Sequence, residues 1–136
     1  MLVSEIMTAN PDAATAQDTV RKVAAMMDEG DYGVVPVVED GRFIGVVTDR
    51  DIAVRAVAQG LGPDTPVSEV MSDDPVCIDP DAEVEEAAEL MVEEQIRRLF
   101  VTDDDDRLIG VVSLGDIALE DDDELVGDTL EDISED

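Results

Sequence analysis

Two stretches of this chain nearly repeat each other: Arg42-Phe43-Ile44-Gly45-Val46-Val47-Thr48 and Arg107-Leu108-Ile109-Gly110-Val111-Val112-Ser113. Both are apolar runs rich in β-branched residues, which is typical of buried strands. Further upstream, Val3-Ser4-Glu5-Ile6-Met7 matches Val67-Ser68-Glu69-Val70-Met71 in the same order. The chain therefore contains an internal repeat, in which one structural unit occurs twice.

The spacing of the apolar residues, and the Gly, Pro and Asp residues between the apolar runs, predict the order β-α-β-β-α for each copy. The first helix of copy one is expected to bury a face that includes Val20, Val23, Ala24 and Met27. Asp40-Gly41 between two apolar runs predicts a tight hairpin. The expected elements are an extended stretch at 13–14, a helix over 19–29, strands over 34–38 and 43–47 and a helix over 48–59, and in copy two an extended stretch at 76–78, a helix over 82–94 and a last helix from 113.

A unit of about 55 residues is too small to bury its own strands well. We therefore expect a mixed α/β fold of the α+β type, in which the two repeats pack sheet to sheet with pseudo-twofold symmetry. The predicted boundaries are 1–60 for the first repeat and 61–119 for the second. Residues 120–136 carry ten acids and no base, which predicts a disordered or loosely docked tail.

The composition is strongly acidic: 37 Asp and Glu face 8 Lys and Arg in 136 residues, for a net charge of −29. Such a surface repels nucleic-acid phosphates and anionic lipid headgroups, so neither is an expected partner. It is typical of cytoplasmic proteins from extreme halophiles, because molar salt shortens the Debye length to about 3 Å and screens the repulsion. An ordinary acidic protein from another source is the alternative.

The chain has no His and a single Cys, so we expect no metal cluster, no disulfide and no catalytic nucleophile pair. An enzyme is therefore a remote interpretation. No apolar run is long enough to span a bilayer, and the first residues lack the basic region of a signal peptide. We expect a cytoplasmic protein.

The repeat resembles a tandem pair of CBS domains over residues 1–119. The residues that carry the resemblance are Met7-Thr8, Asn10-Pro11, Val34-Val35-Pro36-Val37-Val38 and Gly45-Val46-Val47-Thr48 with Asp51 in copy one, and Met71-Ser72, Pro75, Arg97-Arg98-Leu99-Phe100-Val101 and Gly110-Val111-Val112-Ser113 with Asp116 in copy two. The resemblance implies a regulatory module that binds an adenosine-containing ligand (AMP, ADP, ATP, NAD or S-adenosylmethionine) in clefts between the repeats. It also implies a homodimer of such pairs and, since only the acidic tail follows, a regulated partner on a separate chain.

The patterns Thr48-Asp49-Arg50-Asp51 and Ser113-Leu114-Gly115-Asp116 are the sharpest candidates for ligand contact. A hydroxyl at a helix start lies beside free backbone N–H groups, which favour an anion. A carboxylate three residues later only accepts hydrogen bonds, which suits ribose hydroxyls. The resemblance implies these roles for Thr48, Asp51, Ser113 and Asp116. The same pattern is also a helix capping box, which needs no ligand.

Arg97 and Arg98 are adjacent at the start of a predicted strand, so their side chains should point to opposite faces. One of them could bind a phosphate, for which the guanidinium is well suited. Ion pairs with surface acids are the alternative. Tyr32-Gly33 stand at the corresponding place in copy one, where Tyr32 could stack on a base or simply pack.

The resemblance also implies base-side contacts from six residues, each of which could equally be ordinary core. They are Ala13, Ala14, Cys77, Ile78, Val34 and Leu99. Cys77 is expected to be a buried small hydrophobic residue rather than a reactive thiol. Two functions remain open: a sensor that binds an adenosyl ligand, and a ligand-free dimerisation and interaction scaffold.

Overall fold

The computed structural model describes residues 1–73 and 75–120. They form two compact units, each described here by itself. The middle unit is Asp12–Pro75, and the outer unit combines Met1–Pro11 with the described residues 76–120. Apart from Glu120, the predicted acidic tail lies outside the described residues.

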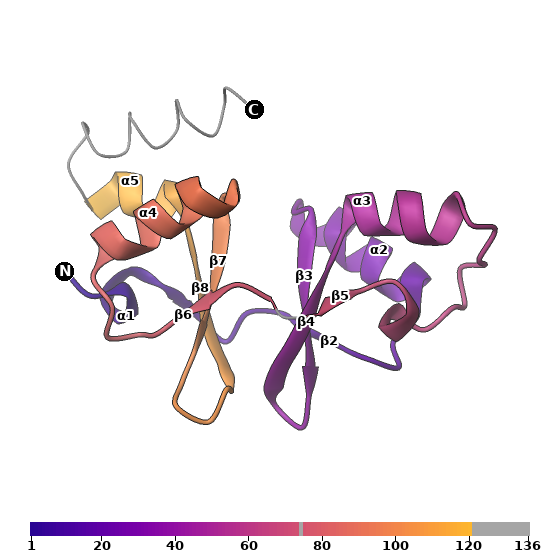
Figure 1. Ribbon diagram of the computed structural model, residues 1–136, viewed down its shortest axis with the longest axis horizontal. Coiled ribbons are helices and arrows are strands. Elements are labelled where there is room, and N and C mark those ends of the chain that lie inside the picture. The colour runs from indigo at the N-terminus through magenta and orange to yellow at the C-terminus, as the bar shows by residue number, and fades with distance from the viewer. Residues whose placement is uncertain (74, 121–136) are drawn as a thin grey trace. The chain divides into compact units, whose positions relative to one another are not determined.

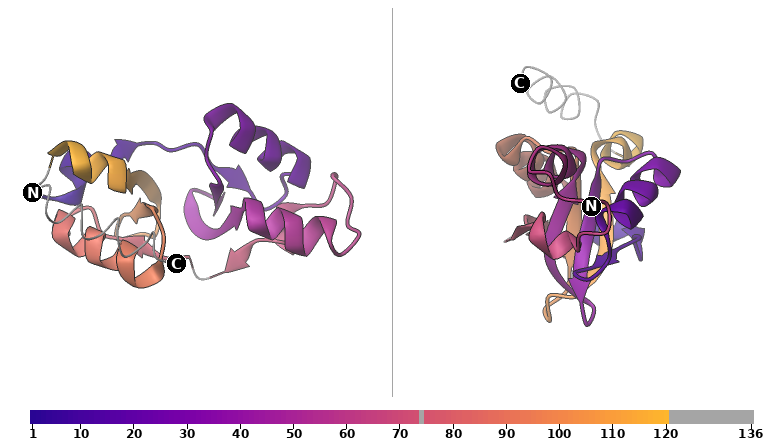
Figure 2. Two further views of the ribbon diagram at one scale, coloured as in Figure 1. Left: turned by 90° about the horizontal axis from the view of Figure 1, so that it is seen from above. Right: turned by 90° about the vertical axis from the view of Figure 1, so that its right-hand side faces the viewer.

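The middle unit contains a four-stranded sheet with the order β2-β3-β4-β5, in which β2 is parallel to β3 and the other pairs are antiparallel. The two main helical segments, α2 and α3 with its continuation η1, lie side by side next to the sheet (Figures 1 and 2). The elements are β2 (Ala14–Thr15), α2 (Val20–Gly30), β3 (Val34–Glu39), β4 (Arg42–Thr48), α3 (Asp49–Asp51), the π-helix η1 (Ile52–Val57), the 3₁₀-helix η2 (Val67–Glu69) and β5 (Ser72–Asp73).

The outer unit repeats this plan with the strand order β1-β8-β7-β6. Here β6 is parallel to β7, and α4 and α5 lie side by side next to the sheet (Figures 1 and 2). The elements are α1 (Val3–Ile6), β1 (Thr8–Ala9), β6 (Cys77–Ile78), α4 (Val84–Glu94), β7 (Arg98–Thr102), β8 (Leu108–Ser113) and α5 (Leu114–Glu120). The predicted mixed α/β fold is confirmed, although each sheet has a fourth strand that the pattern did not reveal.

That fourth strand comes from the other repeat. In the outer unit, β1 pairs with β8, with Ala9 opposite Gly110, and in the middle unit β5 pairs with β4, with Asp73 opposite Gly45. A Cβ at Gly110 would collide with the Met7 thioether, and one at Gly45 would lie 2.7 Å from the Ser72 carbonyl oxygen. We call residues 3–9 and 67–73 the exchanged segments, because each joins the sheet of the other repeat. The two glycines let these segments approach their sheets closely. The compact units are not the same sets of residues as the sequence repeats.

Helix α2 lies within one residue of its predicted bounds, 19–29, at both ends. The Thr19 hydroxyl accepts the Lys22 N–H at 3.1 Å, and Asp31 ends the helix in the left-handed conformation with φ 56°. The buried face contains Val20 and Val23 and continues through the partly buried Met26 and Met27. The expectation for Ala24 is wrong: it is exposed, because the buried stripe turns toward Met26 instead.

The predicted hairpin between β3 and β4 is confirmed. Asp40 and Gly41 both have positive φ, 54° and 83°, as a type I′ turn requires. The β7–β8 connection is closed differently, because the Asp103 carboxylate accepts the N–H groups of Asp105 and Arg107 at 2.9 and 3.0 Å. Each hairpin thus fixes the register of the two longest strands in its unit.

Each unit has its own aliphatic core. The core of the middle unit consists of Ala14, Val20, Val23, Val35, Val37, Val47, Ala56, Val67 and Val70. The core of the outer unit consists of Val3, Ile78, Ala87, Ala88, Met91, Leu99, Val101, Val112, Leu114 and Ile117. Since side chains from the exchanged segments are fully buried in both, these segments are integral parts of the units that hold them.

Candidate functional site

The Thr48–Asp51 pair forms a complete capping box at the start of α3. The Thr48 N–H donates to Asp51 Oδ2 at 3.0 Å, and the Asp51 N–H donates to Thr48 Oγ1 at 3.0 Å. Asp51 is 9% exposed, and its other oxygen, Oδ1, lies 3.8 Å from Arg55 Nε. The carboxylate is therefore held in one orientation, with an oxygen that the cap does not use.

The outer unit repeats this box at the start of α5. The Ser113 N–H donates to Asp116 Oδ2 at 2.9 Å, and the Asp116 N–H donates to Ser113 Oγ at 3.2 Å. Four residues after Asp116, at the position that Arg55 holds after Asp51, the sequence has Glu120. The capping role expected from sequence is thus present in both copies, but the Arg partner belongs to the middle unit alone.

The backbone N–H groups at the two helix starts differ. In the middle unit the Asp49 N–H donates to the Gly33 carbonyl at 3.0 Å, and the Arg50 N–H donates to the Asp49 carboxylate at 2.8 Å. With Asp51 bonded to Thr48, every N–H from residue 49 to residue 51 has an acceptor within the protein. This helix start offers no free donor to an anion.

In the outer unit the Leu114 N–H donates to the Arg97 carbonyl at 3.1 Å, which is the counterpart of the Asp49 bond. The Leu114 side chain is buried in the core, so no carboxylate stands where Asp49 does. No described residue accepts the Gly115 N–H, and Gly115 has no side chain to cover it. The second helix start is therefore the more favourable one for negative charge.

The strand register corrects the expected match of Arg97-Arg98 with Tyr32-Gly33 by one residue. Arg98 pairs with Ser113 as Val34 pairs with Thr48, so Arg98 corresponds to Val34 and Arg97 to Gly33. Strand β7 begins at Arg98, which is half-buried, whereas Arg97 precedes the strand and is exposed. Arg98 is thus the guanidinium that stands in register with the hydroxyl of the capping box.

The base-side candidates divide by burial. Ala14, Ile78 and Leu99 are core residues with 0%, 7% and 0% exposure, so their side chains serve packing. Ala13 and Val34 are half-buried. The expectation that Cys77 is buried is wrong: it is exposed, because successive residues of a strand face opposite ways and Ile78 takes the core side.

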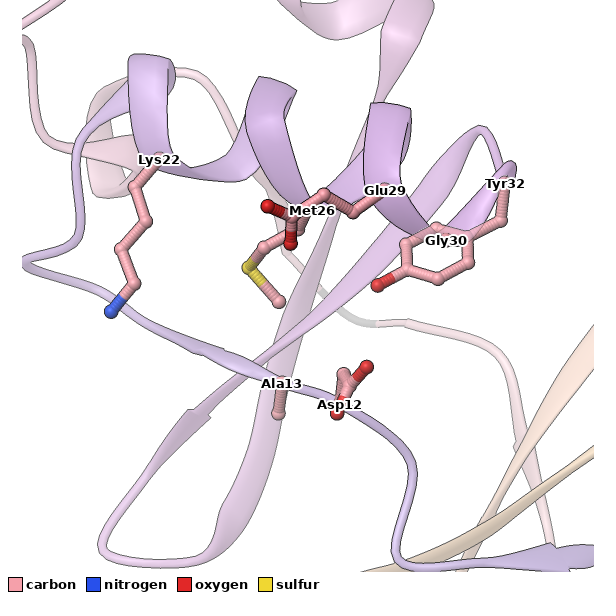
Figure 3. A pocket seen from close by; sticks show the side chains of 7 residues that line it. All are labelled: Asp12, Ala13, Lys22, Met26, Glu29, Gly30 and Tyr32. Atoms are coloured by element: carbon pink, nitrogen blue, oxygen red, sulfur yellow. The ribbon is translucent and has the colours of Figure 1, made fainter.

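The middle unit holds a pocket of about 370 Å³ beside α2. Figure 3 shows Lys22, Met26 and Tyr32 on one side, opposite Asp12 and Ala13 in the segment before β2. The lining residues are Asp12, Ala13, Lys22, Met26, Glu29, Gly30 and Tyr32. The structure thus brings together Ala13 and Tyr32, two of the candidates for ligand contact.

Sequence reasoning missed five lining residues: Asp12, Gly30 and the three α2 side chains of Lys22, Met26 and Glu29. The spacing of these three side chains places them on one helix face, which was the signal that could have found them. Gly30 positions the ring of Tyr32, because a Cβ at Gly30 would collide with that ring. The pocket is therefore a helix face closed at one end by an aromatic side chain.

The ammonium group in this pocket already has a partner. Lys22 Nζ lies 3.2 Å from Asp18 Oδ1, and Asp18 Oδ2 accepts the Thr15 N–H at 2.8 Å. The Thr15 hydrogen bond, helped by Lys22 and opposed by burial, holds the pKa of the Asp18 carboxyl below its ordinary value. Lys22 thus brings little uncompensated positive charge to the pocket.

Across residues 1–73 and 75–120, no three His, Cys, Asp or Glu side chains converge as a metal site would require. In the same ranges, every helix is too short or too polar to cross a bilayer.

Comparison with known proteins places these features in a family. The model of the CBS domain matches residues 3–57 and again 67–123. The CBS domain-containing protein YhcV of Bacillus subtilis is 43% identical over 117 residues, which cover 86% of this chain and 83% of YhcV.

Solved structures agree. The CBS domain protein PAE2072 from Pyrobaculum aerophilum, complexed with AMP, has a TM-score of 0.78 and 27% identity, covering 96% of this chain and 99% of that one. The CBS domain pair of protein MJ0100, in complex with 5′-methylthioadenosine and S-adenosyl-L-methionine, has a TM-score of 0.75 and 27% identity, covering 88% and 94%. With two copies of the family model matched across most of its length, this chain belongs to the CBS domain family as a tandem pair.

Proposed function

We propose that this protein is a regulatory sensor of an adenosine-containing ligand. The observation that carries the proposal is the duplicated capping box, in which each unit presents a fixed carboxylate and a hydroxyl at the start of the helix after its longest hairpin. Family members that share the fold are complexed with AMP in one case and with methylthioadenosine and S-adenosylmethionine in another, which supports this class of ligand.

Each unit supplies the same kinds of contact. Asp51 and Asp116 accept hydrogen bonds from ribose hydroxyls, since an ionised carboxylate only accepts. Ser113 and Thr48 face the group attached to the ribose. In the outer unit Arg97 and Arg98 make a phosphate-bearing ligand the better match, because the guanidinium binds phosphate with two parallel hydrogen bonds.

The base contacts come from side chains that the cores leave accessible. In the middle unit these are Ala13, Val34 and Tyr32, with Gly33 beside them; in the outer unit the exposed Cys77 takes this role. The core residues Ala14, Ile78 and Leu99 support those positions from behind.

The ligand would act by shifting a conformational equilibrium and not by undergoing a reaction. A ligand changes such an equilibrium only by binding one arrangement more tightly than the other. We propose that the readout is contact with a separate partner protein, that the CBS pair forms a homodimer, and that it works in the cytoplasm of a halophile. The acidic composition supports the last point, because a charge of −29 is best tolerated at high salt.

A ligand-free scaffold is the alternative function, and one observation favours it. Val54, Val57 and Leu61 are 47%, 70% and 39% exposed, which leaves apolar side chains of η1 and the following turn open to a partner. Sedimentation of the wild type and of Val57→Ser, with and without adenosyl compounds, separates the two functions. A scaffold assembles equally in both conditions, whereas a sensor responds to the compound.

The test of the main proposal is thermal unfolding in molar KCl with AMP, ADP, ATP, NAD and S-adenosylmethionine. A ligand at 100 times its dissociation constant adds about 2.7 kcal/mol of stability. We expect at least one compound to raise the Tm, and Asp51→Asn or Asp116→Asn to remove that rise. Asp104→Asn, at an exposed hairpin position, is the matched charge control. No rise with any compound at millimolar concentration would contradict the sensor function.

A further inference from the structure

Among the residues that line the pocket beside α2, two are carboxylates and the one cation already has a carboxylate partner. Asp12 and Glu29 both line it, and neither forms an ion pair with a described residue. The lining cation, Lys22, is bound to Asp18 at 3.2 Å. A phosphate entering this pocket would approach two carboxylates and would have to compete with Asp18 for the ammonium.

The remaining walls are apolar or aromatic. Met26 supplies a thioether, Ala13 a methyl group and Tyr32 an aromatic ring that rests on Gly30 (Figure 3). An adenine ring suits such walls, because aromatic stacking and sulfur contacts need no charge. A positively charged sulfonium or ammonium group is also compatible with a pocket lined by a tyrosine ring and two carboxylates.

The chain continues directly from this pocket to the start of α3. Gly33 follows Tyr32, and its carbonyl accepts the Asp49 N–H at 3.0 Å. A Cβ at Gly33 would lie 3.1 Å from Asp49 Oδ2, so this carboxylate lies close against the backbone that joins the two places. Since the N–H groups of residues 49 to 51 are all used within the protein, this end of the site also lacks a donor for phosphate.

From these three observations we infer that the middle unit selects a phosphate-free adenosyl compound, neutral or positively charged at its 5′ side, and discriminates against nucleotides. The inference rests on the proposed function and deepens it by naming the ligand class of one of the two units. Asp12, Glu29 and Asp49 are its specificity-determining residues. They exclude phosphate by charge, while Tyr32 and Met26 hold the base.

Tyr32 also supplies the means to test this inference. The chain has one Tyr and no Trp, so intrinsic tyrosine emission reports on this pocket alone. The experiment titrates the full chain with 5′-methylthioadenosine, S-adenosylmethionine, AMP and ATP, in molar KCl and again at the lowest KCl concentration that keeps the chain folded, because salt screens exposed carboxylates. Free N-acetyltyrosinamide corrects for absorption by the adenine ring. We expect methylthioadenosine and S-adenosylmethionine to change Tyr32 emission with dissociation constants at least tenfold lower than that of AMP, with ATP weakest.

Variants show whether charge is the cause. The double change Asp12→Asn with Glu29→Gln should narrow the tenfold preference to threefold or less, and Asp49→Asn should narrow it in part. The matched control Asp104→Asn removes an exposed acid outside the middle unit and should leave the preference unchanged. A preference that survives the double change would overturn the assignment of specificity to these carboxylates.

The outcomes also separate this inference from the proposed function. If AMP changes Tyr32 emission at concentrations as low as methylthioadenosine does, the inference is wrong while the sensor function stands. If adenosyl compounds raise the Tm but leave Tyr32 emission unchanged, the ligand binds elsewhere and the inference is again wrong. If no compound changes either signal, the proposed function fails and the inference falls with it.

Discussion

The two units share one plan but differ in charge where their helices begin. In the middle unit Asp49 follows the hydroxyl and accepts the next backbone N–H at 2.8 Å. In the outer unit Leu114 holds that position and is buried, Gly115 comes next, and Arg98 stands in register with Ser113. Duplication preserved the capping box and let the residues around it diverge. We infer that the box serves the fold in both units, and we propose that ligand choice depends on its neighbours.

The largest expected effect concerns the glycines beneath the exchanged segments. Gly45→Ala should lower the free energy of unfolding by about 1–3 kcal/mol, since the new Cβ meets backbone that cannot move easily. Gly110→Ala should cost less, because the main obstacle there is the flexible Met7 side chain. Urea denaturation measures both. Gly62→Ala is the control, because nothing lies within 4 Å of its Cβ position. Equal costs at Gly45 and Gly110 would contradict the difference in packing.

The capping boxes predict a smaller effect that is similar in the two units. Thr48→Ala and Ser113→Ala should each cost about 1 kcal/mol, because each removes the acceptor for one N–H in the first turn. Thr48→Ser and Ser113→Thr keep the hydroxyl and serve as controls. Chemical denaturation without ligand gives the values. A loss in one unit only would show that the other box is not a stabilising cap.

The smallest effect is a pH dependence that belongs to the middle unit. Because the folded pKa of Asp18 lies below its ordinary value, its charged form stabilises the folded state above the unfolded pKa, and this contribution is lost as pH falls through the folded pKa. The stability difference between wild type and Asp18→Asn should therefore be constant near neutral pH and shrink in acid. Asp28→Asn, an exposed change in the nearby helix α2, is the control. A difference that grows in acid would contradict this account.

Much of the fold was predictable because the repeat is strong. Three strands of each sheet, the α2 cap at Thr19, the Asp40-Gly41 turn and the capping boxes all follow from local pattern, whereas β1 and β5 do not. The exchange of segments was not predictable. Val3–Met7 and Val67–Met71 have nearly the same sequence, so each fits either sheet equally well. Local preference alone cannot decide which sheet a segment joins.

The site was predictable in part. The pairs Thr48 with Asp51 and Ser113 with Asp116 were found from spacing, and the structure brings each pair into contact. Cys77 was misplaced because a two-residue strand is too short to show alternation. The pocket was missed because Lys22 and Glu29 have the pattern of an ordinary polar helix face, and only the fold places Asp12 and Tyr32 beside them.

The central claim is that the two units bind different adenosyl ligands, and isothermal titration of AMP tests it most directly. The account predicts one AMP site per chain in molar KCl. Asp116→Asn should weaken that site at least tenfold, whereas Asp51→Asn leaves it within about twofold of wild type. If AMP binding is instead lost in Asp51→Asn and kept in Asp116→Asn, or if two equal sites are found, the assignment of phosphate to the outer unit is contradicted.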